Sequence, residues 1–155
     1  MKTVANDIIN NIDHKKIVVW SELYETGVAQ IDKQHMELVD MTNELYEACL
    51  EGKTAAAFKE AMSKMVEYVR FHFTEELKLL EQINFPQIAE HKQQHDTLVW
   101  DILEAVKEYN EGKKYTPNHF VRILKEWVFG HIAISDQSYA IFVAEQRQKG
   151  LLAEL

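Results

Sequence analysis

The chain has 155 residues, the size of one ordinary domain and enough to bury a single core. Its five Gly and two Pro are too few for the turns of an all-β sandwich, so the composition favours a helical protein with short connections. Twenty-five Asp and Glu against 17 Lys and Arg give a net charge of −8. Because this charge repels polyanions, we expect neither nucleic acid nor an anionic membrane as a partner.

The sequence predicts a cytoplasmic protein. A single cysteine, Cys49, excludes an internal disulfide and fits a reducing compartment. Apolar runs such as residues 17–20 are far shorter than the roughly 20 residues that span a bilayer. Residues 1–16 contain no apolar stretch of the kind found in secretory signals.

Four stretches of the chain carry the apolar periodicity of helices, in steps of three and four residues. The first covers 31–49 and ends before Gly52, a residue type that commonly follows a helix. The second follows the N-cap residue Thr54 and ends before Pro86, because proline cannot continue a helix. The third covers 88–109.

The fourth stretch, 116–142, opens with an N-cap threonine and a proline, and we expect its buried stripe to continue through Ser135, Ser138 and Phe142. Long rods joined by short links predict an all-α fold, namely an antiparallel, up-down-up-down four-helix bundle. We expect a single domain over the whole chain. In that domain, 1–155, the bundle covers about 31–149, and an N-terminal arm, 1–30, packs against it.

The four apolar stripes share one anomaly, because each carries histidine at a core position. A single histidine on an apolar face is usually a satisfied core residue. Five buried imidazoles without a common partner would leave polar atoms unsatisfied, at roughly 1–3 kcal/mol each. A metal centre would satisfy them together. The five histidines are His35, His72, His91, His95 and His131.

The spacing of these candidates also favours a metal. His91 and His95 are four residues apart, so they lie on one helix face and can grip one ion. His72 and Glu76 have the same spacing and offer a nitrogen and a carboxylate. Each pair alone is a weak signal, whereas the joint pattern over four helices is strong.

Seven candidate ligands follow one another in an order that resembles the hemerythrins, and in particular their bacterial members. The stretch from Trp20 to His35, the Phe85-Pro86 pair and Trp127 are similar as well, and the resemblance covers about residues 17–142. The ordered motifs are His35, His72-Phe-Thr-Glu-Glu76, His91-x-x-x-His95 and His131-x-x-x-x-Asp136.

The resemblance implies two iron ions per chain, bridged by oxide or hydroxide, with dioxygen as the ligand. Of about twelve positions on two six-coordinate irons, five histidines fill five. Bridging carboxylates from Glu76 and Asp136 fill four and the bridging oxygen two, so one position stays open for a small ligand. The resemblance implies that the filled iron is held by His91, His95 and His131. It implies that the dioxygen-binding iron is held by His35 and His72.

Asp136 poses a geometric problem for this interpretation. It follows His131 by five residues, roughly 140° around an ideal helix, so the two side chains point apart. Because the family pattern needs Asp136 at the metals, we expect a local distortion between Ile132 and Asp136, such as a π-type turn.

The residues beside the ligands are apolar, and the resemblance implies that they wall the dioxygen pocket. The alternative is that they are plain bundle core, and both interpretations can hold at once. These residues are Leu38, Phe73, Trp127, Val128 and Ile132.

The leading interpretation is reversible dioxygen binding by a carrier, storage or delivery protein, not an enzyme. One alternative is a sensor of oxygen, nitric oxide or redox state, which would normally be fused to a signalling module for which 155 residues leave no room. The other is a ferritin-like di-iron oxidase, although such bundles use four Glu and two His, whereas five His and two carboxylates occur here. The redox partner and the role of residues 1–16 stay open.

Overall fold

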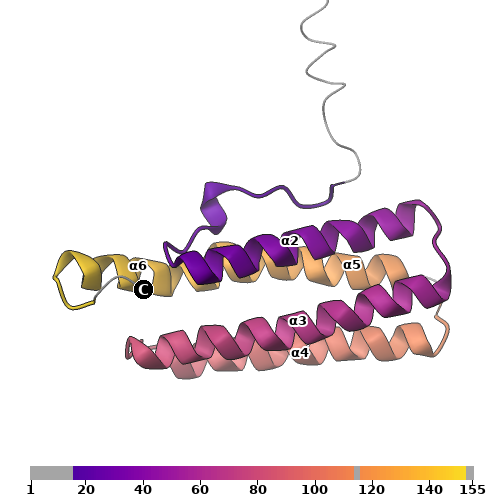
Figure 1. Cartoon of the computed structure of the whole chain (residues 1–155). Helices are drawn as coiled ribbons and strands as arrows, with labels where there is room; N and C mark the ends of the chain where they lie inside the picture. The colour runs from indigo at the N-terminus through magenta and orange to yellow at the C-terminus, as the bar shows by residue number, and fades with distance from the viewer. Residues whose placement is uncertain (1–15, 114–115, 153–155) are drawn as a thin grey trace, which may run out of the picture.

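The computed structural model describes residues 16–113 and 116–152, and this part of the chain is helical without strands. The rod formed by α5, a π-helix and α6 runs on without interruption as the fourth rod of the fold (Figure 1). In chain order the elements are a 3₁₀ turn Glu22–Tyr24, α2 (Ala29–Leu50), α3 (Ala55–Gln82), α4 (Ile88–Asn110), α5 (Thr116–Trp127), the π-helix Val128–Ser135 and α6 (Asp136–Gln148).

The four rods form an antiparallel bundle, as the sequence predicts. Helix α2 packs on α3 and α5, and α4 packs on the same two helices, so each rod has two neighbours. In Figure 1, α2 and α5 make the upper layer, and α3 and α4 the lower layer. The short connections reverse the chain after each rod, which gives the up-down-up-down topology.

The described part of the N-terminal arm packs along α2, as expected. The side-chain amide oxygen of Asn43 accepts hydrogen bonds from the backbone N–H groups of Ile17 and Val18 at 2.9 and 3.0 Å. Its amide nitrogen donates to the Val18 carbonyl at 2.7 Å. Asn43 thus pairs with the arm backbone as a neighbouring strand would. Residues 1–15 lie outside the described part of the chain.

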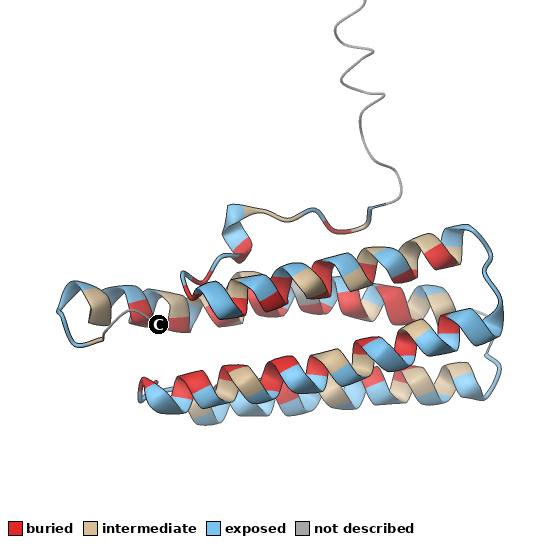
Figure 2. Ribbon diagram, viewed as in Figure 1, coloured by how far each residue is buried: buried red, intermediate tan, exposed pale blue. Residues whose placement is uncertain are grey.

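Buried positions recur along each rod of the bundle (Figure 2). The buried apolar side chains form two clusters, one on each side of a polar layer. The larger cluster fills the bundle around Leu45, Met65 and Phe120. The smaller cluster closes the other end, around Leu80 and Val143. The fourth rod extends to Gln148, and its residues Tyr139 and Val143 belong to this smaller cluster.

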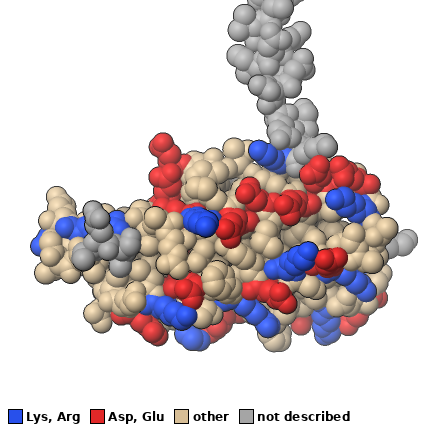
Figure 3. All heavy atoms as spheres, in the orientation of Figure 1, with Lys and Arg blue, Asp and Glu red and all other residues tan. Residues whose placement is uncertain are grey.

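Acidic and basic side chains are interspersed over the face shown in Figure 3. The surplus of acidic residues is therefore not gathered there into one continuous patch. Among the described helices, none combines the length and the apolar character that a bilayer crossing requires.

Candidate metal centre

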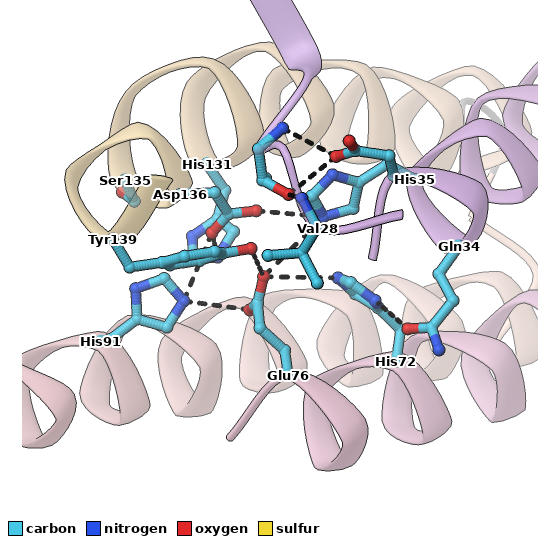
Figure 4. A network of polar contacts seen from close by, with 12 residues as sticks. Val28, Gln34, His35, His72, Glu76, His91, His131, Ser135, Asp136 and Tyr139 are labelled. Carbon is cyan, nitrogen blue, oxygen red and sulfur yellow. Dashed lines mark hydrogen bonds and ion pairs between the residues drawn. The ribbon is translucent and has the colours of Figure 1, made fainter. Parts of the chain in front are cut away.

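The polar layer of the bundle contains all seven predicted ligand residues. His35 lies near the start of α2, His72 near the end of α3, and His91 near the start of α4. His131 lies near the middle of the fourth rod. Because neighbouring rods run in opposite directions, these histidines meet in one layer (Figure 4). Each of the seven is buried, with at most 5% of its surface exposed.

The carboxylate of Glu76 stands between two groups of histidines (Figure 4). Its Oε2 lies 3.0 Å from His91 Nε2 and 2.9 Å from His95 Nε2. Its Oε1 points the other way, 3.8 Å from His35 Nε2 and 3.9 Å from His72 Nε2. One carboxylate therefore offers an oxygen to each group.

Asp136 repeats this arrangement from the fourth rod. Its Oδ1 lies 2.9 Å from His131 Nε2 and 3.3 Å from His91 Nε2, while its Oδ2 lies 3.1 Å from His35 Nε2. The layer thus divides into two halves that share both carboxylates. We call them the three-histidine half (His91, His95 and His131) and the two-histidine half (His35 and His72).

The donor atoms of this layer fit metal ions better than they fit one another. In each half the nitrogen and oxygen atoms lie within 4.8 Å of one another. Both oxygens of Asp136 and the Nε2 atoms of His35 and His72 are buried without a hydrogen-bond partner among the described residues. Since unsatisfied buried polar atoms are costly, cations between them would remove the cost. Imidazole and carboxylate together suit iron.

The pKa values of these groups show how strongly the layer is charged. Burial raises the pKa of Glu76, but hydrogen bonds with the surrounding histidines outweigh burial and hold the pKa well below its ordinary value. Burial lowers the pKa of His72 to about 3. Burial also lowers the pKa of His35, but the Asp136 and Glu76 carboxylates outweigh it and raise the value to about 10. A carboxylate that stays ionised so deep in the bundle attracts cations.

The predicted distortion before Asp136 is confirmed. Residues Val128–Ser135 form a π-helix, in which the backbone N–H of Asp136 donates to the carbonyl of His131, five residues earlier. This bond stacks residues i and i+5, so both side chains face the same centre. The distortion begins at Val128, earlier than the expected Ile132.

The π-helix also corrects the predicted stripe of the fourth rod. The extra residue in its turn shifts the buried positions by one, so Asp136, Tyr139 and Val143 are buried. The predicted Ser138 is exposed, and Ser135 and Phe142 are half-buried. An ideal helical period therefore gives the wrong face beyond His131.

Sequence reasoning missed Tyr139 because of this shift. Its hydroxyl is fully buried and donates to Glu76 Oε1 at 2.5 Å, on the side of the two-histidine half. Burial raises its pKa well above the ordinary value, so the phenol keeps its proton. A stripe drawn with one added residue after His131 would have found it.

Gln34 was missed as well, because it lies next to His35 and beside the main stripe of α2. The Nδ1–H of His72 donates to its amide oxygen at 2.8 Å. An amide oxygen can only accept, so this bond fixes the tautomer of His72 and leaves Nε2 with its lone pair toward the carboxylates.

Four of the apolar residues predicted to wall a pocket, Leu38, Phe73, Trp127 and Ile132, belong to the larger apolar cluster. Leu38 and Ile132 are fully buried. Phe73 stacks on the His95 ring with centroids 3.7 Å apart, and Trp127 lies nearly parallel to the His131 ring at 6.3 Å. Both aromatic rings thus contact the three-histidine half. The side chain of Val128 lies outside the described residues.

Comparisons with known proteins agree with the geometry. The sequence of residues 26–140 matches the family model of the hemerythrin HHE cation binding domain. The chain is 30% identical over 124 residues to a bacteriohemerythrin of Stenotrophomonas maltophilia, covering 80% of each chain. It is 30% identical over 122 residues to one of Pseudomonas aeruginosa, covering 79% of this chain and 78% of the relative. A crystal structure of wild-type hemerythrin superposes with a TM-score of 0.73 at 25% identity, over 81% of this chain and 96% of the other.

Proposed function

Because the chain belongs to the hemerythrin family of non-haem iron, oxygen-binding proteins, we propose that it binds dioxygen reversibly at a pair of iron ions. The observation that carries this proposal is the orientation of the Glu76 and Asp136 carboxylates. In each carboxylate, one oxygen faces the three-histidine half and the other faces the two-histidine half. Such a pair of carboxylates is suited to bridging two ions.

We propose that the two halves hold one iron each and that the unequal number of histidines decides where dioxygen binds. The three-histidine half offers one more nitrogen, so the two-histidine half keeps a position for a small ligand. Iron, when bound, supplies the reversible electron transfer to dioxygen. We also propose that the arm and the bundle belong to one domain over residues 1–155.

The residues around the two-histidine half favour release of dioxygen over its reduction. Leu38, one turn after His35, and Ile132, next to His131, are fully buried and apolar, so a charged competitor would lose its hydration beside them. The hydroxyl of Tyr139 lies on this side and donates a hydrogen bond to the Glu76 carboxylate. Its raised pKa makes it a poor proton donor for cleavage of the oxygen–oxygen bond.

The test combines metal analysis with visible spectra. We expect close to two irons per chain, and a charge-transfer band that appears in air and fades under argon over several cycles. One iron per chain at saturation, or preference for zinc in an iron-replete host, would contradict the di-iron centre. Continued oxygen consumption with a reductant, without any reversible coloured state, would favour the ferritin-like oxidase instead.

A further inference from the structure

The three-histidine half is the side of the centre that meets the surface. A groove of about 410 Å³ between α4 and the fourth rod is lined by His131 together with Trp127, Gly130 and residues of α4. A second groove, of about 240 Å³, is lined by His91. By contrast, His35 and His72 of the two-histidine half are 0% exposed.

This asymmetry separates two chemical requirements. Dioxygen needs a free position on an iron, which the proposed function places in the two-histidine half. An electron donor needs only close contact with a ligand, because electrons can pass through the imidazole. A donor in the 410 Å³ groove would contact the His131 ring, whose Nε2 is 2.9 Å from the shared carboxylate of Asp136.

The groove offers both apolar walls and unused polar atoms. Leu98 and Ile123 belong to its lining. Two lining residues, Trp127 and Gln94, carry a buried indole N–H and a buried amide Oε1 that have no hydrogen-bond partner among the described residues. A ligand that fits this lining is a small ring with one acceptor for the indole and one donor for the amide.

The charge of the groove narrows the class of ligand further. Asp101 and Glu126 also line it, and the whole chain carries −8, so an anionic donor is disfavoured. The volume lies within the usual range of about 300–1,000 Å³ for small-molecule sites. A neutral dihydroxyaryl compound, a quinol, meets the demands of shape, polarity and charge together.

We propose that this groove binds a small neutral quinol, which returns the oxidised centre to the dioxygen-binding state through His131. This inference rests on the proposed function. Oxidation of one quinol to its quinone breaks two O–H bonds and releases two electrons and two protons. The two electrons would reduce two ferric ions held by the centre to the ferrous state, one electron each, and the two protons would pass to water at the mouth of the groove.

The first experiment measures binding without any redox step. Equilibrium dialysis of trimethylhydroquinone against the reduced, iron-loaded protein under argon should show one saturable site. Gly130→Phe should abolish it, because a Cβ at Gly130 meets no atom within 4 Å and a phenyl ring there fills the groove. The matched control is Ala57→Phe, in a groove between α2 and α3 that holds no histidine.

The second experiment measures electron entry. Reduction of the oxidised centre by trimethylhydroquinone should slow at least tenfold in Gly130→Phe and remain unchanged in Ala57→Phe, while the dissociation rate of dioxygen stays the same in both. If Gly130→Phe does not fold, Thr97→Trp blocks the groove from the exposed side of α4. Equal quinol rates in the wild type and the groove variants would overturn the inference.

The two proposals fail in different ways. A protein that binds dioxygen reversibly but does not bind the quinol would retain the proposed function and contradict the proposed quinol site. A protein that binds the quinol in the groove at Gly130 but has no reversible coloured state would contradict the proposed function, and with it the role of the groove in reduction.

Discussion

The two halves of the metal layer share both carboxylates but differ in depth and in support. In the three-histidine half, aromatic rings stack on the ligands, and grooves reach His91 and His131. In the two-histidine half, the rings are fully buried, and an amide and a phenol set the orientation of the donors. One half of the layer is thus reached by grooves from the surface, and the other half is fully buried. If the two proposals hold, this separation would let electrons enter without admitting the anions that would displace dioxygen.

The difference arises from how the rods supply their side chains. Helix α4 contributes two histidines on one face, four residues apart, and α2 and α3 contribute one each.

The backbone before α2 is bound to α6 by two hydrogen bonds. Arg147 Nη1 donates to the Gly27 carbonyl at 2.8 Å, and Gln137 donates to the Glu25 carbonyl at 3.1 Å. These bonds tie the arm to the rod that carries Asp136.

The largest effect expected is that of removing a ligand from the three-histidine half. His95→Ala should reduce iron from about two to about one per chain or less, and should lower the free energy of unfolding, because metal binding and folding are coupled. Iron analysis and denaturant unfolding measure both. His119→Ala is the control, since its side chain is 40% exposed on α5; His14 lies outside the described residues. Iron loss in the control would contradict the assigned ligand set.

A smaller effect is expected for Tyr139→Phe, which removes only the hydroxyl that supports the two-histidine side of Glu76. A hydrogen bond to a charged group contributes about 1.5–3 kcal/mol, so the free energy of unfolding should fall by that amount. Tyr109→Phe should change it by less than about 0.5 kcal/mol, because that hydroxyl makes an exposed 3.3 Å bond to the Ala55 carbonyl. Equal losses in both variants would show that Glu76 does not depend on the phenol.

Gln34→Ala tests whether the two-histidine half depends on its supporting amide. Loss of the partner of His72 Nδ1 should weaken iron binding in this half about tenfold, the lower end of the usual range for such partners. Chelator titration, followed by iron analysis, measures the change. The matched control variant is Gln30→Ala, because the Gln30 amide makes a long, exposed hydrogen bond to Glu75 at 3.4 Å. If both variants release iron alike, Gln34 does not position His72.

The smallest effect expected concerns the closed side. Ile132→Asn should speed irreversible oxidation of the oxygenated protein several-fold without changing the iron count, because an amide at this fully buried position admits water. The decay of the coloured state in air gives the rate. Ile134→Asn, at a side chain that is 73% exposed, should leave that rate unchanged. An unchanged rate in Ile132→Asn would show that this wall does not protect bound dioxygen.

The sequence by itself determined the four rods, their order and the seven residues of the polar layer. Histidines in apolar stripes, the stops at Gly52 and Pro86, and the spacing of His91 and His95 are local signals, and local signals survive in a linear sequence. The need for a π-type turn was also visible, because five residues do not close an ideal helical turn.

Only the tertiary structure decided which oxygen of each carboxylate faces which half, that Tyr139 replaces Ser138 on the buried face, and that a groove ends at His131. These features depend on distances between rods, and no periodicity within a single rod carries such distances. The π-helix is the clearest case. One added residue per turn rotates every later side chain, so the face that α6 buries follows from the packing of Asp136 in the layer and not from the pattern of its own residues.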